Sequence, residues 1–167
     1  MQQSGKVTIC GYRPGAIGRV TELHADFYSK NSGFGLFFEA KVAADMSAFL
    51  NRFNETMDGF WVAIVEDHIV GSIAIDGIKS KSEGAHLRWF IVDPEYQGQG
   101  IGNMLIREAL AFCRSADFKK VFLWTFAGLD RARHVYETFG FTLAKEHSGT
   151  QWGVTVKEQM FELALGP

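Results

Sequence analysis

The sequence is poor in cysteine and in proline. Its 167 residues include two cysteines and three prolines. Cys10 and Cys113 stand far apart, with no CxxC pair and no histidine at the spacing of metal ligands, so we expect neither a structural zinc site nor another bound metal. A disulfide between the two stays open as an alternative, but two reduced thiols in a cytosolic protein are the simpler interpretation.

Long apolar runs and an excess of one charge are missing as well. No apolar stretch approaches the roughly 20 residues that cross a bilayer, and Met1–Val7 lacks the charged-then-apolar pattern of a signal peptide. The 17 basic and 19 acidic side chains give a net charge of −2, whereas nucleic-acid binders usually carry a basic excess. We therefore expect a cytoplasmic protein that binds neither a membrane nor nucleic acid.

Apolar residues, by contrast, are plentiful. They make up 47% of the sequence, and charged residues 22%, which is typical of a globular protein and excludes disorder as the main state. A chain of this length can bury a substantial core, and no low-complexity segment or internal repeat interrupts it. We expect a single domain over residues 1–167.

Hydrophobic periodicity predicts an α+β fold with a mixed sheet of about seven strands and about four helices. Two β-rich runs, Gly59–Val65 and Ile69–Ile75, are joined by three polar residues and predict an antiparallel hairpin. A helix-period segment at Ile101–Arg114 lies between two strands and predicts a β-α-β crossover. The other strands are expected at Val7–Tyr12, Ala85–Val92, Lys120–Phe126, Phe141–Lys145 and Val156–Leu165, the other helices at Ile17–Tyr28, Phe37–Phe53 and Asp130–Thr138, and a turn at Lys30–Gly33.

The most informative segment is Gln97-Gly98-Gln99-Gly100-Ile101-Gly102, a glycine-rich loop between a strand and a helix. Such a loop presents main-chain N–H groups without intrahelical partners at the positive end of the helix dipole. Glycine permits positive φ and lets a ligand approach closely, so the natural ligand is a phosphate or pyrophosphate. The spacing matches neither the P-loop nor the GxGxxG dinucleotide fingerprint. A purely structural turn needs one glycine, and this loop has three.

The same segment resembles the (Arg/Gln)-x-x-Gly-x-(Gly/Ala) signature of the GNAT superfamily of acyl-CoA-dependent N-acyltransferases. The preceding Phe90-x-Val92-x-Pro94 is similar to that family's fourth strand, and the stretch from Ala132 through Tyr136 to Gly140-Phe141 resembles its tyrosine-containing segment. The order of the expected elements fits the family's fold over nearly the whole chain. A closer resemblance is to the acetyltransferase half of bacterial proteins that fuse a MarR-type regulator to a GNAT domain; it is carried by Leu23-His24 through Tyr28, Phe38-Glu39-Ala40, Leu123-Trp124-Thr125 and Trp152-Gly153 to Leu163.

The resemblance implies acetyl-CoA as the cosubstrate and a way of holding it. The loop amides would bind its pyrophosphate, and the main chain of the fourth strand would pair with the pantetheine arm like an added strand. An N–H near Val92 would polarise the thioester carbonyl. The residues implied in cofactor binding are Phe90, Ile91, Val92, Gln97, Gly98, Gln99, Gly100, Ile101, Gly102 and Asn103.

The resemblance also implies direct attack of an amine on the thioester, so neither cysteine is expected to act as a nucleophile. Tyr136 occupies the family's tyrosine position and is expected to protonate the leaving thiolate. His86 stands where many members have a carboxylate, and we expect it to take the amine's proton directly or through one water. Strand alternation places His86 on the same face as Arg88 and Phe90. A packing tyrosine and an exposed edge histidine are the structural alternatives.

In this family the first two helices and the last hairpin usually wall the acceptor pocket. The candidates there are His24, Tyr28, Phe34, Phe38, Glu39, Trp124, His147 and Trp152. Glu39 suits a cationic amine, whereas core packing is the alternative for the aromatic residues. Leu129 stands where an asparagine often orients the cofactor arm, which departs from the family pattern. Arg133 is a candidate for a phosphate contact, with a solvated surface arginine as the alternative.

Two classes of function follow. The first is an acetyl-CoA-dependent N-acetyltransferase that acts on a primary amine of a small molecule or a protein. The alternative is a catalytically silent acyl-CoA-binding sensor or partner module that keeps the loop without turnover. A nucleotide-binding domain is disfavoured by the glycine spacing. For assembly, the family resemblance suggests a homodimer formed through the C-terminal strands.

Overall fold

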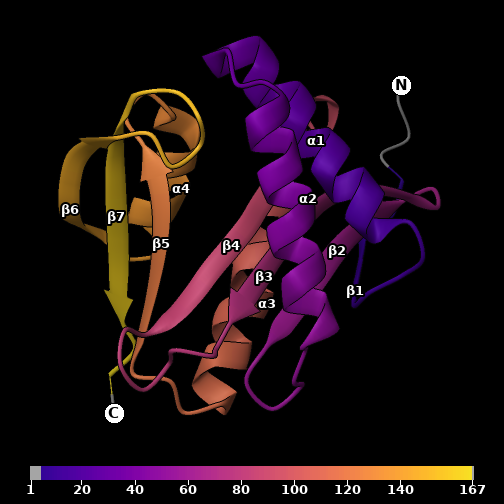
Figure 1. Ribbon diagram of the computed structural model, residues 1–167. Coiled ribbons are helices and arrows are strands. Elements are labelled where there is room, and N and C mark those ends of the chain that lie inside the picture. The colour runs from indigo at the N-terminus through magenta and orange to yellow at the C-terminus, as the bar shows by residue number, and fades with distance from the viewer. Residues whose placement is uncertain (1–4, 167) are drawn as a thin grey trace.

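In the computed structural model, which describes residues 5–166, seven strands form one mixed sheet in the order β1-β2-β3-β4-β5-β7-β6. Helices cover both faces of this sheet (Figure 1). The expected α+β fold with a mixed sheet is therefore confirmed. The first four residues of Met1–Val7, where we expect no signal peptide, lie outside the described range. Within residues 5–166, the helices are too short or too polar to span a bilayer.

The order of elements agrees with the sequence prediction. The described residues contain four helices, α1 (Ala16–Ser32), α2 (Leu36–Asn51), α3 (Ile101–Ser115) and α4 (Asp130–Thr138), and one short 3₁₀ turn, η1 (Pro94–Tyr96). The strands are β1 (Thr8–Cys10), β2 (Gly59–Val65), β3 (His68–Asp76), β4 (Ala85–Val92), β5 (Lys120–Phe126), β6 (Thr142–Gly149) and β7 (Val156–Ala164).

The sheet separates two hydrophobic cores. Helices α1 and α2 pack on one face, where Val20, Met46 and Phe49 are buried against the sheet. Helices α3 and α4 pack on the other face, around buried residues such as Leu105 and Tyr136. Cys10 packs against the first core and Cys113 lies in the second, and both are free thiols.

The predicted hairpin of β2 and β3 is confirmed, and its turn is tighter than expected. Glu66 and Asp67 both have positive φ, 48° and 68°, and Val65 pairs with His68. This is a two-residue connection whose twist suits the right-handed twist of the flanking strands. His68 therefore begins β3 and does not belong to the turn.

Some element ends differ from the prediction. Helix α1 runs through the predicted turn to Ser32 and ends only at Gly33, which has a φ of 68°. The polar residues at this end support the helix, because Lys30 pairs with Asp26 one turn earlier, at 2.9 Å. Strand β1 is shorter than expected, since it pairs with β2 over three residues only. Strand β6 is longer, because its pairing with β7 continues past a register shift to Gly149.

The predicted crossover places β4 and β5 side by side and parallel, but only for a short distance. The two strands pair at Ala85 with Val121 and at His86 with Phe122. Beyond these pairs the strands part toward their C-terminal ends (Figure 1). In the described part of the chain, the main chain of β4 from Leu87 to Val92 therefore has no partner strand on its β5 side, and the gap is framed by α1, α3 and α4.

A bulge in β4 corrects the predicted orientation of Phe90. The register between β3 and β4 shifts between Ser72 and Ala74, and Trp89 has a φ of 46°. Arg88 and Trp89 thus both turn toward α1 and α2, and Phe90 packs against the core on the α3 side. The extra residue of a bulge breaks the simple alternation of faces, so the prediction that His86, Arg88 and Phe90 share one face was wrong for Phe90.

Candidate active site

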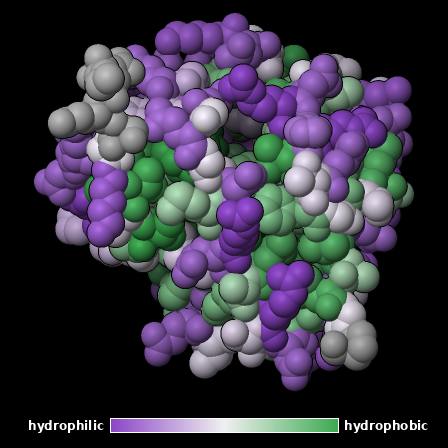
Figure 2. Space-filling model, turned by 180° about the vertical axis from the view of Figure 1, so that it is seen from behind, coloured by the Kyte–Doolittle hydropathy of each residue, from purple (hydrophilic) through white to green (hydrophobic). Residues whose placement is uncertain are grey.

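A groove of about 750 Å³ opens where β4 and β5 diverge. In the view from behind, the surface is hollowed near its top, the end at which these strands finish (Figure 2). The groove is lined by the end of β4, the glycine-rich loop, the first residues of α3 and the start of α4. Of the predicted cofactor-binding residues, all except the exposed Gln99 line it: Phe90, Ile91, Val92, Gln97, Gly98, Gly100, Ile101, Gly102 and Asn103.

The glycine-rich loop offers a row of hydrogen-bond donors to this groove. Within residues 5–166, no main-chain amide from Gly98 to Asn103 donates to a main-chain carbonyl. Gly98 and Gly100 have φ values of 81° and 82°, and, apart from their chain neighbours, no described residue has an atom within 4 Å of a Cβ added at either position. These amides and the N-terminus of α3 form a site suited to an anion.

Gly102 serves a different purpose from the one predicted for it. Its φ is helical and not positive. A Cβ at this position would lie 3.3 Å from Cζ of Phe90, which is tighter than an ordinary van der Waals contact. Gly102 therefore favours the close packing of α3 on β4 and does not supply a left-handed backbone.

An arginine that sequence reasoning missed lies at the groove. Arg131, in the first turn of α4, lines it and donates to the side chain of Gln97, whose amide in turn donates to the carbonyl oxygen of Val92 at 3.3 Å. Arg133, the arginine singled out from the sequence, does not line the groove: it pairs with Glu137 at 2.6 Å and lies over the ring of Phe161. The sequence did offer one signal for Arg131, because it stands at the start of the predicted helix, beside the expected cofactor site.

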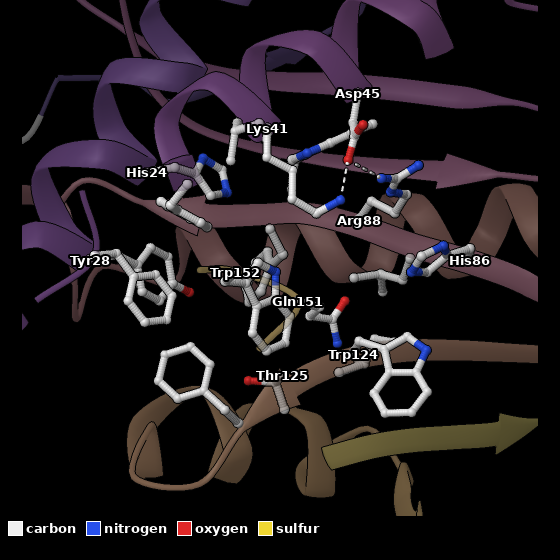
Figure 3. A pocket seen from close by; sticks show the side chains of 18 of the residues that line it. His24, Tyr28, Lys41, Asp45, His86, Arg88, Trp124, Thr125, Gln151 and Trp152 are labelled. Atoms are coloured by element: carbon white, nitrogen blue, oxygen red, sulfur yellow. Dashed lines mark hydrogen bonds and ion pairs between the residues drawn. The ribbon is translucent and has the colours of Figure 1, made fainter. Parts of the chain in front are cut away.

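A second, smaller cavity of about 170 Å³ lies on the α1 and α2 side of the same gap. Four side chains line both hollows, Tyr28, Phe90, Phe126 and Tyr136, so the cavity and the groove meet there. The cavity is walled by α1, α2, β4, β5 and the loop before β7 (Figure 3). Of the predicted acceptor-binding residues, six line it: His24, Tyr28, Phe34, Phe38, Trp124 and Trp152.

The other two predicted acceptor residues lie elsewhere. Glu39 is exposed on α2 and is not part of the cavity wall. His147 lies on β6, where its Nε2 is 2.8 Å from the buried carboxylate of Glu158 and its ring meets Trp124 edge to face. His147 thus contacts the back of a lining residue without lining the cavity itself.

The cavity also has a charged wall that the sequence did not reveal. Lys41 and Asp45 come from α2 and Arg88 from β4 (Figure 3). One carboxylate oxygen of Asp45 lies 3.0 Å from the ammonium of Lys41 and 3.5 Å from the guanidinium of Arg88. The two residues on α2 are one helical turn apart, but their partner on β4 is brought to them only by the fold.

Tyr136 lies where the two hollows meet. It is 6% exposed and packs against Phe90, Phe141 and Phe161 at ring distances of 5.9 to 6.2 Å. Burial, with a smaller contribution from nearby Tyr28, raises the pKa of the Tyr136 phenol well above its usual range. Burial likewise raises the pKa of Tyr28 to about 12. Both hydroxyls are therefore protonated at neutral pH and can donate hydrogen bonds.

The cavity contains two histidines, and both are neutral. His24 is 5% exposed, and its Nδ1 lies 2.8 Å from the carbonyl oxygen of Val20. Since a carbonyl only accepts, Nδ1 carries the hydrogen and Nε2 keeps its lone pair. Burial lowers the pKa of His24 to about 4.

His86 lies at the opposite end of the cavity from Tyr28 (Figure 3). Its ring stacks on Phe122 with 4.5 Å between the ring centres. Burial and the charge of Arg88 lower the pKa of His86 to about 3. It is half-buried, so the alternative of an exposed edge histidine does not describe it.

The fold is shared with solved acetyltransferase structures. An acetyltransferase from Streptococcus agalactiae superposes with a TM-score of 0.76 at 20% identity, over 98% of this chain and 99% of that one. A putative acetyltransferase from Salmonella typhimurium, solved with acetyl-CoA, superposes with a TM-score of 0.71 at 14% identity, over 96% and 94% of the two chains. These likenesses define the fold as that of an acyl-CoA N-acyltransferase.

The family follows from the sequence comparisons. Residues 19–141 match the model of the acetyltransferase (GNAT) family, and the chain belongs to that family. N-acetylaspartate synthetase of Xenopus tropicalis is 35% identical over 82 residues, which cover 49% of this chain and 30% of that protein. Human N-acetyltransferase 8B is 29% identical over 109 residues, 63% of this chain and 48% of that protein. The chain thus spans less than half the length of these curated relatives.

Proposed function

We propose that this protein is an acetyl-CoA-dependent N-acetyltransferase that acts on a primary amine of a small molecule or a protein. One observation carries the proposal: a groove with a row of free main-chain amides joins a walled cavity at Tyr136. The groove suits an elongated molecule with a pyrophosphate, and the cavity suits the second reactant. The chain's membership of the GNAT acetyltransferase family supports this assignment.

The residues of the groove fit acetyl-CoA. The free amides from Gly98 to Asn103 would hold the pyrophosphate at the N-terminus of α3, and Arg131 would add a positive charge on the other side of the groove. The main chain of β4 before Val92, unpaired on its β5 side, would bind the pantetheine arm as an added strand. When bound, acetyl-CoA supplies a thioester, which is an activated acyl group.

The chain's own residues would then assist the transfer at the point where the two hollows meet. A main-chain N–H near Val92 would donate to the carbonyl oxygen as negative charge develops there. Tyr136, whose raised pKa keeps the phenol protonated but makes it a weaker acid, would donate a hydrogen bond and then its proton to the departing sulfur as negative charge develops there. Cys10 and Cys113 line neither hollow, and we assign them no chemical role.

The acceptor amine must lose a proton, and we propose that a neutral imidazole of the cavity receives it, directly or through a water. His86 is the residue expected from the family pattern. A conjugate acid with a pKa near 3 makes it a weak base, so its main contribution would be a hydrogen bond to the amine or to a water. His24 offers a lone pair of defined orientation on Nε2 and lies near Tyr28, at 6.2 Å between ring centres.

A catalytically silent acyl-CoA-binding module is the alternative function. Leu129 favours it, because this apolar residue lines the groove where an asparagine often orients the cofactor arm. We also propose that residues 1–167 form one domain, that the protein is cytoplasmic, and that it forms a homodimer through its C-terminal strands without binding nucleic acid. The closer similarity to MarR–GNAT fusion proteins stays a prediction.

Calorimetric titration of acetyl-CoA tests the cofactor site. Gly100→Glu and Gly100→Lys impose the same backbone strain at a φ of 82° but carry opposite charges. We expect the native protein to bind with a Kd in the micromolar range, at about −8 kcal/mol. Gly100→Glu should bind acetyl-CoA with an affinity about tenfold or more below that of Gly100→Lys, since the introduced charge repels the pyrophosphate in one variant and attracts it in the other. A folded native protein that does not bind would refute the proposal; binding without thiol release on any amine would favour the silent module.

A further inference from the structure

The cavity's charged wall carries more positive than negative charge. Lys41 and Arg88 share one oxygen of Asp45, at 3.0 Å and 3.5 Å, so the three lining groups have a formal charge of +1. Arg88 also lies 3.4 Å from Asp76, which pairs with Arg52 at 2.5 Å. Arg52 in turn pairs with the buried Asp58 at 3.2 Å. The three cations and three carboxylates of this network balance one another, but both cations other than Arg52 line the cavity and only one of the carboxylates does. Arg52 and Asp76 do not line the cavity.

The remaining polar groups of the wall add no charge at neutral pH. Burial keeps His24 and His86 in their neutral forms, with pKa values of about 4 and about 3. Burial also keeps the phenols of Tyr28 and Tyr136 protonated by raising their pKa values. Thr125 and Gln151, which complete the polar lining, are uncharged. Among the described lining residues, the excess positive charge is therefore not balanced, and its nearest compensating carboxylate, Asp76, lies behind the wall.

The rest of the cavity is aromatic. Phe34 and Phe126 lie 5.2 Å apart between ring centres. Trp152 stacks on Phe34 at 6.5 Å and lies tilted against Phe126 at 5.5 Å. Such rings suit an apolar side chain. The ammonium of Lys41 uses one of its three donors on Asp45, so donors remain for a second oxygen ligand.

We propose that the amine acceptor also carries a carboxylate, which Lys41 and Arg88 bind, and that it is a small amino acid with an apolar side chain. This inference rests on the proposed function. The reaction is unchanged: the C–N bond of the amide forms as the C–S bond of the thioester breaks, and the amine's proton ends on the thiol. An acceptor that enters as an ammonium releases one further proton to solvent. Polyamines, which bring only positive charge, should be excluded.

The test compares each amino acid with the same molecule lacking its charge. Thiol release from acetyl-CoA is measured with phenylalanine, its methyl ester and 2-phenylethylamine, with leucine and 3-methylbutylamine, and with spermidine. We expect kcat/KM for the amino acid to exceed that for the ester and the amine by about tenfold or more, the effect of a hydrogen bond to a charged group. Equal or better use of the amine, the ester or spermidine would overturn the proposal.

Substitutions of Lys41 and Arg88 test whether these two side chains cause the preference for amino acids over amines. Lys41→Met should reduce the ratio of kcat/KM for phenylalanine over 2-phenylethylamine by about tenfold, mainly through KM. Arg88→Lys should keep more of that ratio than Arg88→Gln, which removes the charge. Lys119→Met is the matched control, because Lys119 is exposed and lies outside both hollows. A ratio unaffected by Lys41→Met and Arg88→Gln would overturn the assignment.

The two proposals fail in different ways. Absence of acetyl-CoA binding in calorimetry would refute the proposed function, and this inference with it. Binding of acetyl-CoA together with turnover of amines but not of amino acids would refute the inference alone. Binding without turnover of phenylalanine or leucine also counts against it.

Discussion

The side-chain hydroxyl of Ser72 on β3 donates a 2.7 Å hydrogen bond to the main-chain carbonyl oxygen of Trp89 on β4. Ser72 is fully buried, and its partner is the residue of positive φ at the bulge. This bond replaces a main-chain hydrogen bond between β3 and β4 that the bulge interrupts. The bulge turns Arg88 toward the cavity and lets Phe90 pack on the α3 side, where the cavity and the groove meet, so Ser72 supports both halves of the site without lining either.

Ser72→Ala should therefore destabilise the protein and weaken cofactor binding. The substitution leaves the carbonyl oxygen of Trp89 without its partner, which we expect to lower the free energy of unfolding by about 1–2 kcal/mol. Urea unfolding and acetyl-CoA titration measure the two effects. Ser82→Ala is the control, because the hydroxyl of Ser82 is exposed and bonds at 3.4 Å. Equal stability of the two variants would contradict this role.

Tyr136→Phe removes the proposed proton donor and preserves the ring. We expect kcat to fall about a hundredfold, as for other general acids, with little change in acetyl-CoA affinity. Because the pKa of Tyr136 is raised, the native enzyme should show no loss of kcat from phenol ionisation as the pH approaches the usual tyrosine pKa. Tyr12→Phe, at an exposed position, serves as the control. Unchanged turnover in Tyr136→Phe would leave that tyrosine a packing residue.

Arg131→Gln should weaken acetyl-CoA binding and reduce its dependence on salt. Arg131 lines the groove, whereas Arg133 is paired with Glu137 outside it. We expect a loss of affinity of about three- to tenfold for Arg131→Gln, typical of one charge-assisted contact, and none for Arg133→Gln. Titrations at low and high salt distinguish the two variants. A larger effect at Arg133 would mean that the phosphates lie on the other face of α4.

Protein stability should decrease as the pH falls toward 4. The pKa of His24 is lowered by burial to about 4, below the value of about 6.5 in an unfolded chain. Between these two pH values the unfolded state binds the proton and the folded state does not. The contribution of His24 to the free energy of unfolding is therefore complete above about pH 6.5 and is lost as the pH falls toward 4. The loss is at most about 3 kcal/mol for this group.

Urea unfolding at several pH values checks this slope. His24→Asn can keep a donor near the carbonyl oxygen of Val20 but cannot titrate, so the decline in its free energy of unfolding should be shallower. His86 adds to the native slope in the same direction, because its pKa is also lowered. His68→Gln, at an exposed position, should leave the slope as it is. A native protein as stable at pH 4.5 as at pH 7 would show that neither histidine is buried in the neutral form.

Local patterns were sufficient to predict most of the fold. The bounds of β2, β4, β5 and α4 agree with those predicted from their runs of apolar residues and the turn residues at their ends, because these signals are local to each segment. The ends of α1 and β6 were less predictable. Polar residues of a helix end and of an edge strand have no periodic apolar pattern, and their extent depends on pairing with a neighbour.

The candidate site likewise has features that the local sequence predicts and features that depend on the tertiary structure. The sequence by itself determined the glycine-rich loop at the start of α3 and the tyrosine of α4, since each is a contiguous segment whose function depends on its own backbone. Only the tertiary structure decided that Lys41 and Asp45 meet Arg88, that Phe90 faces α3, and that Arg131 and not Arg133 reaches the groove. These relationships join residues on separate elements, and they depend on one bulge and on where β4 and β5 part, which no local period records.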